Sequence, residues 1–255
     1  MVLVTTVDLN CDLGEGFGAW TFVDDDTLLS LVSSANVACG FHAGDPSIMR
    51  RVCAAAAERG VTVGAHVGYR DLAGFGRRAM RVPAAQLADE VLYQLAALDG
   101  VARTVGARVR YVKPHGALYN VIVGDAEQAG AVVDAVRAYD PGLAVLGLPG
   151  SQVLRIAAEQ GLPAVVEAFG DRAYQADGRL VPRRVPGALV TDPDTVAARC
   201  LELARTGKVT SLDGAPVEVR ARSLCIHGDT PGAVELVRRT REVLEGDGVT
   251  IAPFA

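Results

Sequence analysis

Residues 46–66 read Pro-Ser-Ile-Met-Arg-Arg-Val-Cys-Ala-Ala-Ala-Ala-Glu-Arg-Gly-Val-Thr-Val-Gly-Ala-His, and they hold the unit from which we predict the fold. An alanine-rich segment with helical spacing, Pro46–Arg59, is followed by Gly60, a residue suited to ending a helix. A short apolar run, Gly60–His66, comes next and ends in a histidine. The stretch therefore predicts a helix, a tight turn and a buried strand in immediate succession.

The same alternation of short apolar runs and longer helical segments extends along the chain. We expect strands in the runs Val2–Leu9, Ser34–Cys39, Gly60–His66, Arg108–Val112, Leu143–Leu148, Pro163–Phe169 and Arg222–Ile226. We expect helices in the segments Pro46–Arg59, Pro83–Val105, Asp125–Tyr139, Ser151–Gln160, Pro193–Arg205 and Pro231–Leu244. Repeated strand-then-helix units are typical of an α/β protein with a parallel sheet.

A closed β/α barrel of about seven or eight units is favoured over an open doubly wound sheet. The chain has no glycine-rich dinucleotide fingerprint and no break in composition, and its 255 residues suit one barrel domain spanning residues 1–255. Two stretches do not fit simple units. Gly170–Asp192 is a long polar loop, and Gly207–Val219 contains Leu212-Asp-Gly-Ala, which predicts a small hairpin. We expect both to decorate a mostly parallel barrel.

Composition and charge narrow the class of protein. Half of the residues are hydrophobic, 22% are charged, and the net charge of −5 offers no basic surface for nucleic acid or an anionic membrane. No apolar run reaches the roughly 18 residues of a transmembrane helix, and the N-terminus lacks the basic segment of a signal peptide. The five cysteines include no Cys-x-x-Cys pair, which argues against a disulfide framework and a thiolate zinc site. We therefore predict a cytoplasmic protein that binds neither nucleic acid nor a membrane.

Polar side chains gather where the predicted strands end. Active sites of parallel barrels form at the carboxyl ends of the strands, so this position is informative. Because side chains alternate along a strand, Asp8, Asn10 and Asp12 should all face the barrel axis or its mouth. All four histidines also fall at predicted strand ends: His42, His66, His115 and His227.

Several of these polar residues also have an ordinary structural interpretation. Asp8 is equally well explained as a buried structural acid, and Asp229, close before a proline, has the features of a helix N-cap. Arg77 and Arg78 form either a solvated basic turn or a clamp for a carboxylate or phosphate. Cys225 is read as a small core hydrophobe rather than a nucleophile.

Six motifs taken together resemble the LamB/YcsF family. They are Asp-Leu-Asn-Cys-Asp-Leu-Gly-Glu at 8–15, Asn-Val-Ala-Cys-Gly-Phe-His-Ala-Gly-Asp at 36–45, Gly-Ala-His-Val-Gly-Tyr at 64–69, Lys-Pro-His-Gly-Ala-Leu-Tyr at 113–119, Glu-Ala-Phe-Gly-Asp-Arg at 167–172 and His-Gly-Asp at 227–229. The resemblance runs from about residue 6 to residue 252, and Arg70 departs from it where proline is expected.

The resemblance implies a (β/α)7-type barrel related to those of glycoside hydrolases and deacetylases. It also implies that the chain works as one component of the prokaryotic 5-oxoprolinase. That enzyme opens 5-oxo-L-proline to L-glutamate, coupled to ATP hydrolysis, and the resemblance implies partner subunits B and C. ATP would then be a co-substrate of the complex, and the small-molecule ligand would be the lactam.

The candidate residues suit this chemistry. A five-membered lactam is an unreactive amide, and phosphorylation of its oxygen would make it a far better electrophile for water. The site then needs a base for water, cations for the developing negative charge, and a proton donor for the ring nitrogen. The catalytic candidates are Asp12, His42, His66, Lys113, His115 and His227. The substrate-binding candidates are Asp8, Asn10, Asn36, Arg77, Glu167, Asp171, Arg172 and Asp229.

Lys113 is one of only two lysines and stands two residues before His115. A lysine ammonium is a compact charge whose pKa, about 10.4 when unperturbed, falls on burial or beside other cations. We therefore expect Lys113, crowded by His115, to donate a proton as well as to stabilise charge. The sequence holds no Walker-type phosphate loop, so the chain alone should bind ATP weakly and open little lactam.

Two rival functions are compatible with the same residues. Related barrels hold a divalent ion with an Asp-His-His set, and Asp12, His42 and His66 would supply one in a metal-dependent, deacetylase-like amide hydrolase. The chain would otherwise be a non-catalytic binding protein or regulator. In that case, histidine and lysine substitutions would leave the activity of the complex intact.

Overall fold

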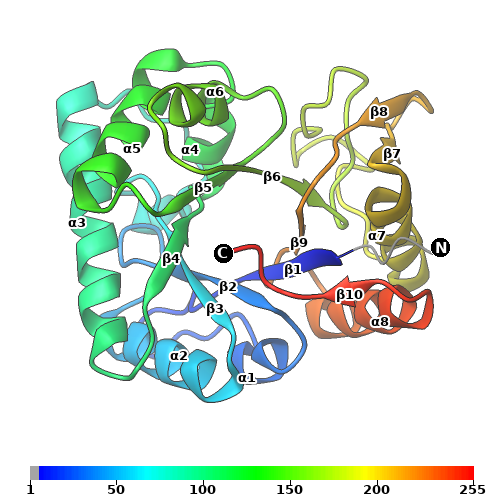
Figure 1. The fold of residues 1–255 in the computed structure, drawn as a ribbon, viewed down its shortest axis with the longest axis horizontal. Helices are drawn as coiled ribbons and strands as arrows, with labels where there is room; N and C mark the ends of the chain where they lie inside the picture. The colour runs from blue at the N-terminus through cyan, green and yellow to red at the C-terminus, as the bar shows by residue number, and fades with distance from the viewer. Residues whose placement is uncertain (1–5) are drawn as a thin grey trace.

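Parallel strands closed into a barrel form the centre of the computed structural model, which describes residues 6–255 (Figure 1). Neighbouring strands follow the order β1-β2-β3-β4-β5-β6-β9, and β9 returns to pair with β1, which closes the barrel. The strands are β1 (Thr6–Leu13), β2 (Ser34–Ala38), β3 (Thr62–His66), β4 (Val109–Val112), β5 (Ala144–Gly147), β6 (Ala164–Phe169) and β9 (Ser223–Ile226). This closure confirms the predicted (β/α)7-type barrel and excludes the open doubly wound sheet.

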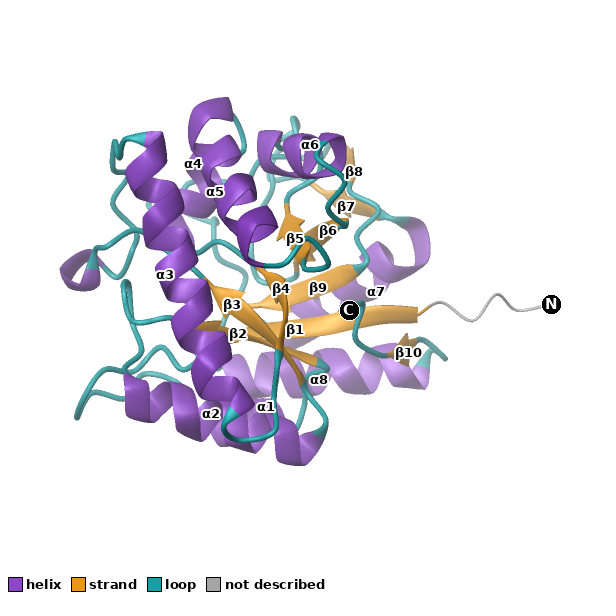
Figure 2. Cartoon of the chain, turned by 60° about the vertical axis from the view of Figure 1, so that its left-hand side comes forward, coloured by secondary structure: helices purple, strands orange, loops and turns teal. Residues whose placement is uncertain are grey.

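Helices surround these strands on the outside (Figure 2). They are α1 (Asp25–Leu29), α2 (Pro46–Arg59), α3 (Ala84–Arg103), α4 (Gly116–Val121), α5 (Ala126–Tyr139), α6 (Gln152–Glu159), α7 (Pro193–Thr206) and α8 (Ala233–Gly246), with the 3-10 turn η1 (Leu72–Gly74). The helix quoted from the sequence has the predicted ends, because Asp45 accepts backbone N–H bonds at its start and Gly60 is left-handed at its end, with φ of 67°. No helix within residues 6–255 combines the length and apolar character needed to cross a membrane.

A small hairpin lies outside the barrel, and two strands differ in extent or number from the predicted ones. The predicted hairpin is present as β7 (Lys208–Thr210) paired antiparallel with β8 (Pro216–Glu218). The first strand reaches Leu13, further than the predicted run, whose residues 2–5 lie outside the described part of the chain. A two-residue strand that was not predicted, β10 (Thr250–Ile251), extends the sheet beside β1.

The barrel interior has an apolar base and a polar mouth. Tyr111, Ala144, Leu146 and Val165 form a small apolar cluster, against which Phe254 packs from the C-terminus. Above this cluster, the inward side chains of β1 are the polar ones, as the alternation predicted, whereas its outward side chains join the main core beneath the helices. Most of the charged groups inside the barrel therefore lie toward the carboxyl ends of the strands, whereas Asp8 lies near the amino end of β1.

Gly64 gives a direct test of this interior packing. A Cβ at Gly64 would overlap the ring of Tyr111, which is fixed because its hydroxyl donates a 2.6 Å hydrogen bond to Asn36. We expect Gly64→Ala to reduce the free energy of unfolding by about 3 kcal/mol in urea denaturation. The control is Gly100→Ala on the exposed face of α3, where the new methyl group would meet no atom of residues 6–255 within 4 Å apart from its own helix backbone and its chain neighbours, and it should stabilise by about 1 kcal/mol. A Gly64→Ala chain as stable as the wild type would contradict the packing.

Candidate active site

Lys113 is the central charge of the barrel mouth. It follows the end of β4, and its side chain is only 2% exposed. The Nζ atom lies 3.0 Å from Asp12 Oδ1 on β1 and 3.2 Å from Glu167 Oε2 on β6. It also donates to Cys225 Sγ at 3.0 Å, on β9. One buried ammonium is therefore held by side chains from three other strands.

These neighbours raise the pKa of Lys113 rather than lower it. Burial by itself would lower the pKa, but the charge of Asp12, the contact with the Cys225 sulfur and the charge of Glu167 outweigh burial, so the pKa lies well above its usual value. The direction of this shift is opposite to the fall in pKa that was expected for a proton-donating Lys113. The expectation considered only His115, the nearest ionisable residue in sequence, whereas carboxylates from distant strands decide the charge. The carboxylates of Asp12 and Glu167 therefore favour the charged form of Lys113.

Three histidines and Glu15 form a buried cluster beside Lys113. The ring of His42 stacks on that of His115 with centroids 3.7 Å apart, and His66 stands perpendicular to both. Glu15 Oε1 lies 3.3 Å from His42 Nε2 and 3.3 Å from His115 Nδ1. Burial and the neighbouring imidazoles hold the pKa values of His42 and His115 well below the usual value. Both rings are therefore neutral at pH 7.

The pKa values of Glu15 and of the neighbouring Asp12 are shifted in opposite directions. Burial, and then the charge of Asp12, raise the pKa of Glu15 well above its usual value. Burial also favours neutral Asp12, but His66 and Lys113 prevail and hold the pKa of Asp12 well below the usual range. Asp12 is thus the ionised partner of Lys113.

Asp171 and His227 form a second buried pair. His227 Nδ1 lies 3.0 Å from the carboxylate of Asp171, and the hydroxyl of Thr230 donates to the same carboxylate at 2.6 Å. Although burial favours the neutral acid, these interactions hold the pKa of Asp171 below its usual value. Because Nδ1–H donates to the carboxylate, the other ring nitrogen of His227 carries the lone pair. This pair can orient His227 to accept or return a proton.

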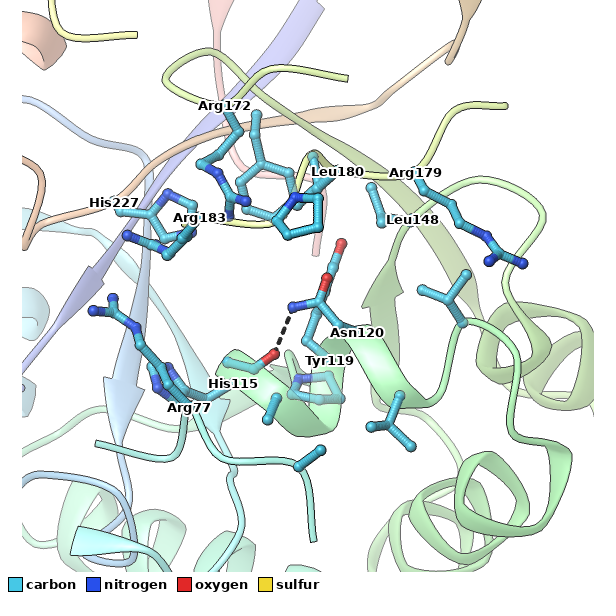
Figure 3. A pocket seen from close by; sticks show the side chains of 18 of the residues that line it. Arg77, His115, Tyr119, Asn120, Leu148, Arg172, Arg179, Leu180, Arg183 and His227 are labelled. Atoms are coloured by element: carbon cyan, nitrogen blue, oxygen red, sulfur yellow. Dashed lines mark hydrogen bonds between the residues drawn. The ribbon is translucent and has the colours of Figure 1, made fainter. Parts of the chain in front are cut away.

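A cavity of about 770 Å³ opens above these groups. Lys113, His66, His115 and His227 line it together with a set of arginines: Arg77, Arg172, Arg179 and Arg183. In the close-up, Arg77 stands on the side of His115, whereas Arg172 and Arg183 stand across the opening with His227 (Figure 3). The cavity therefore suits a small anionic ligand.

Arg172 also shapes the loop that forms one wall of this cavity. Its guanidinium donates to the backbone carbonyl of Val181 at 2.7 Å and to that of Ala188 at 3.4 Å, which folds residues 170–192 back on themselves. Burial, and then the charge of Arg183, lower the pKa of Arg172 to about 10. Arg77 makes a different contact: at the rim of the cavity its guanidinium forms an ion pair with the carboxylate of Asp229, at 2.5 Å.

Three of the substrate-binding candidates lie below the cavity rather than on its wall. Asp8 accepts hydrogen bonds from Ser33, Ser34 and Ser223, and its buried position raises its pKa. Asn36 donates to both Asn10 and Asp12, at 2.7 and 2.8 Å, and supports the carboxylate that pairs with Lys113. The other candidates surround the cavity or the buried groups just described.

Sequence reasoning missed four residues of the site. Glu15 is the last residue of the first quoted motif, three residues after Asp12. Its position close to the end of a strand that carries Asn10 and Asp12 could have identified it as a site residue. Tyr119 ends the fourth quoted motif, and Arg179 lies in the long polar loop after the sixth strand; both line the cavity. Arg183 belongs to a loop without periodicity, so only the folded structure brings it to the cavity.

Comparisons with known proteins point to the same family along nearly the whole chain. The sequence model of the LamB/YcsF family matches residues 7–255. The chain is 65% identical to the 5-oxoprolinase A subunit of Streptomyces avermitilis, over 98% of this chain and 100% of that one. It is 56% identical to the 5-oxoprolinase A subunit of Mycobacterium avium, over 97% and 98% of the two chains.

Two solved structures are also similar. The lactam utilization protein from Thermus thermophilus is 46% identical, with a TM-score of 0.93 over 98% of this chain and 100% of that one. A family 4 carbohydrate esterase from Streptomyces lividans covers 98% and 93% of the two chains with a TM-score of 0.50. At 13% identity, that second likeness concerns the barrel fold alone.

Proposed function

The chain belongs to the LamB/YcsF family, and from this premise we propose that it is the ring-opening component of an ATP-dependent 5-oxoprolinase. The relatives that it matches are named as the A subunit of 5-oxoprolinase, and that name supports a complex of several different chains. The observation that carries the proposal is that the buried cation Lys113 and the His227 ring, oriented by Asp171, line the same cavity together with several arginines.

The cavity suits an activated lactam. Its volume of about 770 Å³ lies within the range of small-molecule sites. 5-Oxo-L-proline carries a carboxylate, and a phosphorylated form carries more negative charge. Arg77, Arg172 and Arg183 offer guanidinium groups for either anion. Their grouping around one cavity supports an anionic substrate over a neutral one.

The proposed reaction begins with transfer of the γ-phosphoryl group of ATP to the lactam oxygen. Because this chain lacks a Walker-type loop, we assign that step to partner subunits B and C. Water then adds to the carbonyl carbon, the ring nitrogen takes a proton, and the ring C–N bond breaks to leave an acyl phosphate. A second water cleaves the acyl phosphate to L-glutamate and phosphate.

The buried groups have distinct roles in this scheme. Lys113 stabilises the negative charge that develops on oxygen, as a fixed cation in a site of low dielectric. His227 accepts the proton of the attacking water and returns one to the ring nitrogen, and Asp171 positions its imidazole. Asp12 and Glu167 hold Lys113 in place.

Reconstitution with partner subunits B and C tests the proposal. The complex should convert 5-oxo-L-proline to L-glutamate only when ATP is present, and ADP should form in step with glutamate. The isolated chain should show negligible turnover with or without ATP. Rapid ring opening by the isolated chain, or by the complex without ATP, would refute the proposal.

Arg183 offers a test of anion binding in the cavity. Removing one charged hydrogen-bond donor costs about 1.5–3 kcal/mol, so Arg183→Ala should raise KM for 5-oxo-L-proline about 10- to 100-fold with little change in kcat. The control is Arg184→Ala, because Arg184 is exposed and does not line the cavity. Equal KM values for the two variants would contradict the assignment of Arg183.

A further inference from the structure

The proton positions on His66 and His115 are fixed by the backbone. His66 Nδ1 lies 2.9 Å from the carbonyl oxygen of Lys113, and His115 Nε2 lies 2.8 Å from the carbonyl oxygen of Phe75. A carbonyl oxygen only accepts hydrogen bonds, so each of these nitrogens carries its ring's proton. The opposite nitrogens, His66 Nε2 and His115 Nδ1, therefore present lone pairs in the neutral rings.

These two lone pairs face each other in a buried space. His66 Nε2 and His115 Nδ1 are 3.0 Å apart. Glu15 Oε1 lies 3.3 Å from His115 Nδ1 and 3.8 Å from His66 Nε2. Asp12 Oδ2 adds a fourth electron-rich atom, 3.4 Å from His66 Nε2. Acceptor atoms held this closely, away from water, are unfavourable unless a positive species lies between them. That species is either a shared proton or a metal ion.

We propose that Glu15, His66 and His115 bind a divalent transition-metal ion. The three interatomic distances leave a point about 2 Å from all three atoms, which is the length of zinc–nitrogen and zinc–oxygen bonds. Two imidazoles and one carboxylate are a donor set that such ions prefer. Metal-bound histidines also donate their other N–H to a backbone carbonyl or carboxylate, as both rings do here.

His42 supports this site rather than completing it. Its ring is parallel to that of His115, with an interplanar angle of 6°, so the lone pairs of the two rings lie in separate parallel planes. One ion cannot lie in both planes. His42 Nε2 instead lies 3.3 Å from Glu15 Oε1. The proposed set therefore differs from the Asp12, His42 and His66 set suggested by related barrels.

The loop that follows β3 is built around the same cluster. It supplies the Phe75 carbonyl that fixes His115. Gly76 has a φ of 63°, and a Cβ there would lie 2.7 Å from atoms of both His42 and His115. This close approach encloses the cluster on the loop side, whereas His66 and His115 line the cavity on the other. An ion bound there would supply a Lewis acid or activate water for chemistry in the cavity.

Metal titration of the purified chain tests this site independently of catalysis. After removal of metal with a chelator, the chain should bind one Zn²⁺ by calorimetry and one Co²⁺ by visible absorption. His66→Ala and His115→Ala should each weaken Zn²⁺ binding at least about 100-fold. The matched control is His227→Ala, which replaces the one histidine of the chain outside the cluster and should leave Zn²⁺ affinity unchanged.

Glu15→Gln is a milder variant, because the size of the side chain is nearly unchanged. It should also weaken Zn²⁺ binding by at least about tenfold. Its circular dichroism spectrum should stay that of the wild type. Failure of the folded wild-type chain to bind Zn²⁺ would overturn the proposal in favour of a shared proton. Equal Zn²⁺ affinity in the wild type and in the Glu15→Gln variant would overturn it as well.

Discussion

Replacing Lys113 with methionine is expected to lower kcat/KM of the assembled complex about 1,000-fold and to destabilise the chain by about 3–5 kcal/mol. The first effect follows from losing the cation that stabilises developing charge on oxygen. The second follows because Asp12 and Glu167 would remain buried at the same mouth without the ammonium that lies between them. Initial rates of glutamate formation and urea denaturation measure the two effects separately.

Matched variants separate charge from folding at this position. Lys208→Met changes the other lysine of the chain, which is exposed on β7, and should alter neither quantity. Adding Glu167→Gln to Lys113→Met removes one unpaired charge, so stability should recover in part while activity stays low. Lys113→Arg should also impair activity, because a planar guanidinium does not fit the space of a compact ammonium. A Lys113→Arg complex with unchanged lactam opening would contradict the role given to Lys113.

Asp171→Asn is expected to lower kcat about 1,000- to 10,000-fold while the chain stays folded, by analogy with the carboxylate that orients the histidine of serine proteases. The carboxylate of Asp171 accepts the Nδ1–H of His227. An amide at this position can donate to Nδ1, which would move the ring proton to Nε2 and remove the lone pair from the cavity side. The dependence of kcat on pH should change with it.

Asp99 provides the control for this substitution. It is a buried carboxylate that accepts bonds from the backbone N–H of Val109 and from the side chains of Arg103 and Tyr139, and it does not line the cavity. Asp99→Asn should therefore reduce stability and leave kcat unchanged. If Asp171→Asn behaved in the same way, Asp171 would have a structural role only.

The repeating features of the fold could be predicted from the sequence. Alternation along β1 correctly put Asp8, Asn10 and Asp12 on one face, and the spacing of apolar runs gave the closed barrel. The short elements could not be predicted in this way. The six-residue helix α4 and the two-residue strand β10 are shorter than the windows over which periodicity becomes apparent.

The electrostatics of the site could not be predicted from local sequence. Asp12 and Glu167 are 101 and 54 residues from Lys113, and only barrel closure brings them to its ammonium. For that reason the sign of the Lys113 pKa shift was predicted wrongly. The same limit explains why Arg183 was not predicted as a cavity residue. Its loop has no periodicity from which the direction of a side chain can be inferred.

The most direct test of ring opening in this barrel is glutamate formation by complexes that differ only in this chain. Partner subunits B and C, ATP and 5-oxo-L-proline are combined with the wild-type chain, with Lys113→Met or with His227→Gln, after co-purification establishes that each variant assembles. We expect glutamate from the wild-type complex and almost none from either variant complex. Glutamate formation at the wild-type rate by both variant complexes would contradict the proposal and favour a non-catalytic binding role.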